Sequence, residues 1–90
     1  MKSRRTAAFR SRFDNLPPEA VTQAQVAYRF WRANPRHPSL DFKAIAGKRG
    51  IYSVRIGLHW RAVARVGDDG GFVWFWIGSH AEYDKLLRRL

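Results

Sequence analysis

The spacing of apolar residues changes at Asn34-Pro35, and this change constrains the fold more than any other feature of the sequence. Before it, apolar side chains recur at helical spacing, whereas after it they alternate with polar ones as in β-strands. Helices followed by strands, rather than interleaved with them, are typical of the α+β class. Because 90 residues have room for one hydrophobic core, we interpret residues 1–90 as a single domain.

Residues 17–33 carry the clearest helical pattern. Pro17 and Pro18 suit a first turn, whose backbone N–H groups have no partner within the helix, and Glu19 complements the positive end of the helix dipole. The helix is expected to end at Asn34, because the residue before a proline avoids the helical region. Its predicted apolar face is broad and consists of Ala20, Ala24, Ala27, Tyr28, Phe30 and Trp31.

The segment before this helix is harder to assign. Residues 1–5 are rich in Lys and Arg, and we expect them to form a frayed basic tail. Residues 6–14 fit either a short helix or a strand. The four-residue spacing of Phe9 and Phe13 favours the helix.

Strand-like patterns begin after the long helix. Residues 40–45 can form a strand that ends at Gly47. Residues 52–56 and 60–66 alternate apolar with polar side chains, which is typical of half-buried strands. A turn at 57–59 would bring these two segments together as an antiparallel pair.

Two further elements complete the predicted fold. The glycine-rich residues 67–71 indicate a hairpin turn, and residues 72–77, apolar throughout, are expected to form a central strand covered on both faces. Residues 80–90 carry four bulky side chains at helical spacing, namely Tyr83, Leu86, Leu87 and Leu90. The prediction is an α+β fold in which N-terminal helices pack on a small antiparallel sheet and a short C-terminal helix follows.

The charge of the chain points to an acidic partner. Seventeen Lys and Arg against seven Asp and Glu give a net charge of +10. Such a charge opposes compaction by self-repulsion, so it usually reflects a polyanionic or acidic partner. Nucleic acid is the first candidate and an acidic protein the second, and the two are compatible. A membrane surface fits less well, since no segment sets its basic residues along one face of an amphipathic helix.

Several classes of chemistry lack the residues they need. The sequence has no cysteine and no glycine-rich loop of the kind that cradles phosphates, and its carboxylates are scattered. A two-metal nuclease needs clustered carboxylates, so we expect metal-independent phosphate chemistry and no cofactor. No apolar run approaches the roughly 20 residues that span a bilayer, and the basic start lacks a signal peptide's apolar core. The expected location is the cytoplasm.

Basic residues on the predicted strands are candidates for binding phosphate. If the turn at 57–59 forms, Arg55 comes near Arg61 and Arg65 across the paired strands. Guanidinium groups gathered on a sheet can hold a phosphate and stabilise the charge that develops during its transfer. The alternative is that these arginines are the solvated face of an antiparallel sheet.

Histidine and tyrosine residues are candidates for proton transfer. His80 and Tyr83 are three residues apart, so a helix would place both on one face. Imidazole groups exchange protons near neutral pH, and His59 in the predicted turn is a second candidate. The alternative assigns Tyr83 to the core and His80 to the cap of the last helix, and leaves His59 simply exposed to solvent.

Several stretches resemble the RelE/ParE superfamily of bacterial toxins, within its RelE-like or HigB-like subgroup. Together they span residues 16–87. They are Leu16-Pro17-Pro18-Glu19 before the helix, the loop 34–40 with Asp41-Phe42-Lys43, the paired segments 52–56 and 60–63, and, most specific, the segment 76–86. The resemblance implies a toxin neutralised by a cognate antitoxin, for which an acidic segment is expected. It also implies attack of an mRNA 2′-hydroxyl on the adjacent phosphate, commonly on the ribosome.

The resemblance also implies roles for individual residues. Arg55 and Arg61 match strand cations that grip phosphate, His80 matches a proton-transferring or charge-stabilising residue, and Tyr83 matches a nearby aromatic. Ser53 departs from the pattern, because some nuclease members have a second strand lysine at this place. The remaining residues expected to bind RNA are Lys43, Lys48, Arg49, His59 and Arg65.

Three functional hypotheses follow from the resemblance. The first is a metal-independent mRNA endoribonuclease that inhibits translation. The second is a poison of DNA gyrase, because members of the ParE branch act in that way and lack a nuclease site. The third is a relative that binds an antitoxin or RNA without catalysis.

Overall fold

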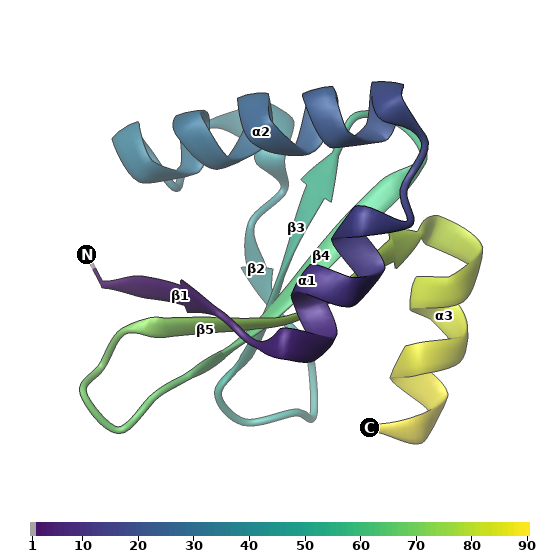
Figure 1. Cartoon of the computed structure of the whole chain (residues 1–90). Coiled ribbons are helices and arrows are strands. Elements are labelled where there is room, and N and C mark those ends of the chain that lie inside the picture. Colours follow the sequence, from purple (N-terminus) through teal and green to yellow (C-terminus); the bar gives the residue numbers. More distant parts are fainter. Residues whose placement is uncertain (1) are drawn as a thin grey trace.

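A five-stranded sheet lies between two layers of helices in the computed structural model, which describes residues 2–90 (Figure 1). The α+β class predicted from the sequence is confirmed. Met1, which the sequence placed in the basic tail, lies outside the described residues. The elements are β1 (Ser3–Arg5), α1 (Ala7–Asp14), α2 (Pro18–Ala33), a 3-10 turn (Pro38–Leu40), β2 (Lys43–Ala44), β3 (Ile51–Ile56), β4 (Trp60–Val66), β5 (Phe72–Ser79) and α3 (His80–Arg89).

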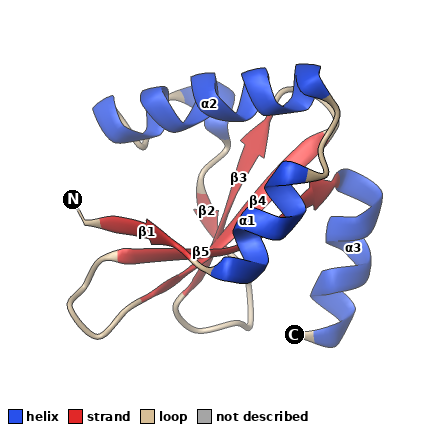
Figure 2. Cartoon of the chain, in the orientation of Figure 1, coloured by secondary structure: helices blue, strands red, loops and turns tan. Residues whose placement is uncertain are grey.

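The sheet has the strand order β1-β5-β4-β3-β2, and its two faces carry different helices (Figure 2). Side chains of α1 and α2, among them Phe9 and Trp31, pack on one face in the larger apolar core. Tyr83 of α3 packs with Val63 and Trp76 on the opposite face in a smaller cluster. The sequence predicted N-terminal helices on one face and a C-terminal helix after the sheet, and the structure places that last helix on the opposite face.

The helix α2 follows the predicted bounds closely. It begins at Pro18, with Glu19 in its first turn, and ends at Ala33 before the extended Asn34. Its buried stripe is narrower than predicted, because Tyr28 and Phe30 are 42 % and 46 % exposed. These two aromatic residues flank the stripe on either side, and the residues that meet the sheet are Ala20, Ala24, Ala27 and Trp31.

Within the ambiguous segment 6–14, residues 7–14 form a helix, as the spacing of Phe9 and Phe13 favours. The Oγ1 atom of Thr6 accepts a hydrogen bond from the Phe9 backbone N–H at 3.1 Å and caps the first turn. Phe9 is buried in the larger core, with Phe13 stacked beside it at a ring separation of 6.3 Å. A cap and two apolar anchors thus fix a helix of only eight residues against β5.

The prediction of a frayed tail is wrong for residues 3–5. Ser3–Arg5 forms the strand β1, which pairs parallel with β5 so that Arg5 lies opposite Trp74. The Ser3 hydroxyl accepts hydrogen bonds from Trp74 Nε1 at 2.9 Å and from the Tyr28 hydroxyl at 3.2 Å. The sequence could not predict this strand, because a charged edge strand pairs through its backbone and shows no alternation of apolar side chains.

This parallel edge corrects two further predictions. The sheet is mixed rather than antiparallel, and β4 rather than 72–77 is its middle strand. The segment 72–77 is nonetheless part of β5 and is largely buried from both faces, as its continuous apolar pattern predicts. The turn at 57–59 and the hairpin at 67–71 both form where the sequence places them.

The strand predicted at 40–45 is mostly absent. Pro38–Leu40 forms a 3-10 turn, and only Lys43–Ala44 pairs with β3. Between them Asp41 has a φ of 43°, in the left-handed region that interrupts a strand. The alternating apolar residues of this segment are therefore buried by a turn and not by a strand: Leu40 is fully buried and Phe42 is partly buried.

The side chain of Arg12 joins α1 to β5 and α3. Its Nε atom donates to the Ile77 carbonyl at 2.7 Å, and its Nη2 atom donates to a Glu82 carboxylate oxygen at 3.2 Å. The guanidinium also lies 4.9 Å from the centre of the Trp76 ring. Because β1 pairs with β5 only as far as Trp74, Arg12 satisfies a carbonyl of β5 beyond that pairing.

We expect Arg12→Ala to lower the free energy of unfolding by about 1–2 kcal/mol, since it removes two charge-assisted hydrogen bonds at partly exposed positions. Urea unfolding at neutral pH measures this loss. Arg10→Ala, an exposed change in the same helix, is the matched control and should stay within about 0.5 kcal/mol of wild type. Equal unfolding midpoints for the two variants would show that Arg12 does not join these elements.

Candidate nucleic-acid site

Three neighbouring strands place one residue each in a row across the face of the sheet that α3 covers. Arg55 of β3 lies opposite Arg61 of β4, and Arg61 lies opposite Gly78 of β5. Neighbouring strands are about 4.8 Å apart, so the row spans roughly 10 Å. The pairing of the two arginines that the sequence predicted is therefore present in the register of the sheet.

The guanidinium of Arg61 is buried rather than open to solvent. Its side chain is 5 % exposed. Its Nη2 atom donates to the Ser53 hydroxyl at 3.1 Å and to the Asp41 carbonyl at 3.3 Å, and both Nη atoms lie 3.4 Å from Asp41 Oδ2. Tyr83 covers it, with its ring centre 5.1 Å from the guanidinium carbon and its hydroxyl donating to Ser53 at 3.1 Å.

Ser53 and Asp41 are the residues of this network that the sequence did not assign to the site. Ser53 stood out only as a departure from a family lysine. It is fully buried and contacts both Arg61 and Tyr83 through one hydroxyl. In the sequence, Asp41 could be singled out only as a carboxylate two residues before Lys43 in a strongly basic chain.

The carboxylate of Asp41 lies between two cations. Lys43 Nζ is 3.3 Å from Asp41 Oδ2, and Arg61 Nη1 is 3.4 Å from the same oxygen. Desolvation alone would raise the pKa of Asp41, but the hydrogen bond and charge of Lys43, together with those of Arg61, outweigh it and lower the pKa below its usual value. Asp41 is therefore negatively charged, and it neutralises the buried guanidinium of Arg61.

His80 lies at the edge of this network and remains accessible. Its backbone N–H donates to the His59 carbonyl at 2.8 Å, which brings the turn after β3 next to the start of α3. The His80 ring is edge-on to Tyr83 at 6.0 Å, and its Nδ1 atom is 3.6 Å from Asp84 Oδ2. With Nδ1 facing Asp84, the Nε2 atom of this half-exposed ring is left for a substrate.

Arg55 is held by the loop before β2. Its Nε atom donates to the Ser39 carbonyl at 3.2 Å, and its side chain is half-buried. One edge of the guanidinium is thus fixed, which leaves the other nitrogen atoms to contact a phosphate. Arg55 and His80 are therefore two accessible groups that adjoin the buried Arg61–Tyr83 pair, Arg55 opposite Arg61 in the sheet and His80 beside Tyr83.

The predicted RNA-binding residues divide between the two ends of the sheet. Lys43 and His59 belong to the end that carries Asp41 and His80. Arg65 is four positions from Arg61 along β4 and pairs with Ile51 and Val73, so the expected cluster of Arg55, Arg61 and Arg65 does not form. The turn that contains Lys48 and Arg49 lies at the Arg65 end, where Val66 N–H donates to the Gly50 carbonyl.

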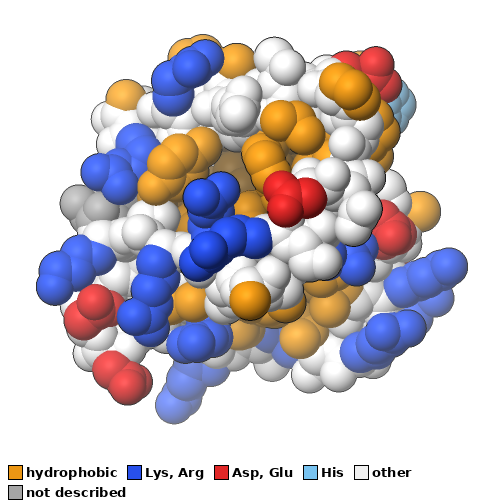
Figure 3. Space-filling model, viewed as in Figure 1, with side chains coloured by type: hydrophobic (Ala, Val, Ile, Leu, Met, Phe, Trp, Pro, Cys, Tyr) orange, Lys and Arg blue, Asp and Glu red, His pale blue; other side chains and the backbone are white. Residues whose placement is uncertain are grey.

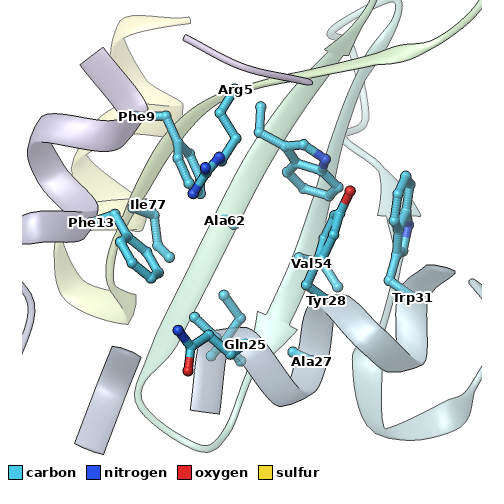
Figure 4. Close-up of a pocket in the computed structure, with 13 residues that line it drawn as sticks. Arg5, Phe9, Phe13, Gln25, Ala27, Tyr28, Trp31, Val54, Ala62 and Ile77 are labelled. Atoms are coloured by element: carbon cyan, nitrogen blue, oxygen red, sulfur yellow. The ribbon is translucent and has the colours of Figure 1, made fainter. Parts of the chain in front are cut away.

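A separate apolar cavity opens between α1, α2 and the sheet. It has a volume of about 370 Å³, and Figure 3 shows it as a hollow with basic side chains beside it. Figure 4 shows Phe9, Phe13 and Ile77 on one side of the cavity and Tyr28 and Trp31 on the other. The polar or charged side chains of its lining are those of Arg5, Gln25 and Tyr28.

Within residues 2–90, no group of three or more His, Cys, Asp or Glu side chains is placed to hold a metal ion. No helix in the same range combines the length and the apolar character that crossing a membrane requires.

The arrangement around Arg55 and His80 can bind an anionic ester and move protons. A guanidinium fixed at one edge can hold a phosphate, and an imidazole beside a carboxylate can accept or donate a proton. Arg61 and Tyr83 cannot contact a ligand in their present positions, because they are 4 % and 6 % exposed. They instead fix the surface on which the accessible groups stand.

The sequence model of the ParE-like toxin domain matches residues 18–85. No curated protein sequence matches the chain at a significant level. Solved structures with a similar fold include a chain of the RelB-RelE antitoxin-toxin complex from Methanococcus jannaschii, at 18 % identity and a TM-score of 0.68, covering 90 % of this chain and 95 % of that one.

Two further structures share this fold. The YoeB/ParE toxin from Agrobacterium tumefaciens is 20 % identical, with a TM-score of 0.68 and coverage of 89 % of this chain and 99 % of that chain. The isolated RelE toxin from E. coli is 14 % identical, with a TM-score of 0.66 and coverage of 98 % and 97 %. At these identities the likeness is one of fold.

We expect Asp41→Asn to lower the free energy of unfolding by about 1 kcal/mol at pH 7, because the amide keeps hydrogen bonds but not the charge opposite Arg61. Asparagine tolerates the positive φ at this position, so the backbone should be unaffected. Since the folded pKa of Asp41 is lowered, its contribution is complete above the unfolded pKa of about 4 and is lost as pH falls through the folded pKa.

Urea unfolding at pH 7 and at about pH 3 checks both parts of this prediction, the lower pH lying below the usual carboxylate range. The variant should lose less stability on acidification than wild type, although Glu82 and Asp69, whose pKa values are also lowered, retain part of the effect. Asp68→Asn in the exposed turn after β4 is the control. The same loss on acidification in wild type and Asp41→Asn would refute the role of this carboxylate.

Proposed function

The chain belongs to the ParE-like toxin family, within the RelE/ParE superfamily of toxins from toxin–antitoxin systems, and from this premise we propose that it is a metal-independent endoribonuclease. Its substrate is mRNA, either free or on the ribosome, and a cognate antitoxin neutralises it. The observation that carries the proposal is that two accessible groups adjoin the buried Arg61–Tyr83 pair: Arg55 lies opposite Arg61 in the sheet, and the His80 ring is edge-on to Tyr83.

The reaction needs a cation at the phosphate and a group that moves protons. The 2′-hydroxyl attacks the adjacent phosphorus while the bond from phosphorus to the 5′-oxygen breaks, leaving a 2′,3′-cyclic phosphate and a 5′-hydroxyl. His80 takes the proton of the 2′-hydroxyl and delivers it to the leaving 5′-oxygen, while Asp84, whose Oδ2 atom is 3.6 Å from His80 Nδ1, orients the ring. Arg55 binds the non-bridging oxygens, where negative charge accumulates.

Arg61 and Tyr83 serve this site as positioning residues. Arg61 neutralises Asp41 and holds Ser53, and Tyr83 lies over the guanidinium from the same helix that carries His80. Loss of either group would shift the start of α3 relative to β3. Such a shift matters because catalysis depends on placing the proton carrier and the phosphate-binding cation within a fraction of an ångström.

A gyrase poison is the second candidate function. Two observations favour it: the matching family is described as ParE-like, and Arg61 is buried, so the surface offers fewer accessible strand cations than a phosphate site with both arginines exposed. In that case the cell suffers DNA damage while its mRNA remains intact.

The antitoxin, we propose, places a bulky apolar side chain in the cavity between α1 and α2. Its walls are mainly apolar, while Arg5 stands in its lining and gives an acidic segment an ion-pair partner. The net charge of +10 on the whole chain would speed association with an acidic antitoxin and make it sensitive to salt. The antitoxin would then neutralise the toxin by binding the face of the sheet opposite Arg55 and His80.

We expect a brief pulse of the wild-type chain in cells to create new mRNA 5′ ends, and His80→Ala to abolish them. Removal of the imidazole should slow cleavage by about 100-fold or more, because proton transfer contributes roughly that much to such reactions. Mapping of mRNA 5′ ends measures the effect. Cleavage of purified RNA in the presence of a metal chelator tests independence from metal ions.

Lys85→Ala, an exposed change in the same helix, is the matched control and should leave the new ends intact. A His80→Ala chain that folds and still cleaves RNA would remove His80 from the mechanism. Growth arrest with DNA damage and no new ends would replace the ribonuclease with the gyrase poison.

We expect Arg5→Glu to weaken binding of the cognate antitoxin by about tenfold or more, since a carboxylate would replace the cation at the cavity. Arg4→Glu is the matched control: Arg4 is the exposed neighbour in β1 and does not line this cavity. Calorimetric titration of each variant with the antitoxin measures the difference. Equal affinities of the two variants would place the antitoxin elsewhere.

A further inference from the structure

The exposed Phe30 and the half-buried His37 form an aromatic stack next to the loop that holds Arg55. Phe30 is 46 % exposed on α2, although a phenylalanine at this position of an amphipathic helix would gain free energy from burial. His37 lies parallel to it, with a ring separation of 5.0 Å and an interplanar angle of 3°. The pair therefore presents flat aromatic surface to solvent without contributing to the buried core.

Hydrogen bonds fix the histidine of this stack. The Nδ1 atom of His37 accepts a hydrogen bond from the Ser39 backbone N–H at 3.2 Å, and the Ser39 hydroxyl is 2.8 Å from the same atom. His37 is also the cap of the 3-10 turn that begins at Pro38. A ring that is already ordered loses little conformational entropy when a flat ligand stacks on the pair.

Ser39 connects the stack to the phosphate-binding arginine. Its carbonyl accepts the hydrogen bond from Arg55 Nε at 3.2 Å, while its backbone N–H and hydroxyl hold His37. One residue thus contacts both the stack and the proposed cation. A strand of nucleic acid with a phosphate at Arg55 would have a neighbouring nucleotide in reach of Phe30 and His37.

The charge around the stack indicates the class of ligand. Arg29 and Arg36, the chain neighbours of Phe30 and His37, are both exposed. Accessible aromatic faces combined with guanidinium groups are the means by which proteins bind single-stranded nucleic acid, since bases stack and phosphates pair with the cations. The exposed Leu58, in contrast, offers an apolar side chain without a flat face.

We propose that Phe30 and His37 form a base-stacking subsite for single-stranded RNA, which holds a nucleotide adjacent to the scissile phosphate. This inference rests on the proposed ribonuclease function and deepens it. Stacking accepts any base, so the subsite adds affinity and sets the register of the strand over Arg55 without reading its sequence. Phe30 and His37 take no part in the bond changes and act only by binding.

The test measures binding of an RNA that cannot be cleaved. A fluorescent 2′-O-methyl oligonucleotide of about 12 nucleotides lacks the attacking hydroxyl, and its length matches the strand that such grooves hold. By fluorescence anisotropy, Phe30→Ala should bind it at least about fivefold more weakly than wild type, as expected for one lost stacking contact. Phe30→Trp should retain the affinity, because it keeps an aromatic face.

Leu90→Ala is the control for the loss of an exposed apolar side chain. Leu90 is 40 % exposed at the end of α3, and its loss should leave RNA affinity unchanged. A second probe with abasic sugars in place of bases isolates the stacking. Wild type should prefer the oligonucleotide with bases, and Phe30→Ala should lose this preference while phosphate binding persists.

The outcomes separate this subsite from the proposed function. Equal affinity of wild type and Phe30→Ala for the RNA, in a chain that cleaves mRNA, would overturn the subsite alone. The same would follow if Phe30→Ala weakened antitoxin binding and left RNA binding intact, since the stack would then belong to a protein partner. A wild-type chain that neither binds nor cleaves RNA would overturn the proposed function itself.

Discussion

The buried guanidinium of Arg61 is the interaction on which the candidate site depends. It joins the loop before β2 through Asp41, the strand β3 through Ser53 and the helix α3 through Tyr83. A cation that is 5 % exposed needs both a counter-charge and hydrogen bonds, and this network supplies them to its two Nη atoms, while Nε has no partner among the described residues. The position of α3 relative to β3 follows from the same contacts, so Arg61 also sets the distance between the accessible groups on those elements.

The two faces of the sheet carry different kinds of side chain. The face under α1 and α2 carries the larger apolar core. It also borders the cavity whose lining includes Arg5. The opposite face carries a small apolar cluster under α3 and, beside it, the polar groups of the candidate site. In the proposed function, the antitoxin side chain in the cavity and the scissile phosphate at Arg55 would therefore contact different side chains.

Burial also decides which of the candidate residues can meet a substrate. Arg55 and His80 reach solvent, whereas Arg61 and Tyr83 contact each other beneath them. The strand pattern places Arg55 and Arg61 opposite each other, and the register agrees. It could not show that a loop carboxylate would neutralise one of the two, because Asp41 reaches Arg61 only through a left-handed turn twenty residues away along the chain.

The sequence by itself determined the α+β class, the long helix predicted at 17–33, the two turns between the last three strands and the C-terminal helix, because local periodicity and turn residues encode these features. It also brought Arg55 opposite Arg61. Only the tertiary structure decided that Ser3–Arg5 is a strand, that α3 covers the second face, and that Arg12 joins α1 to β5 and α3. These features depend on backbone pairing and on contacts between distant residues, neither of which leaves a periodic pattern in the chain.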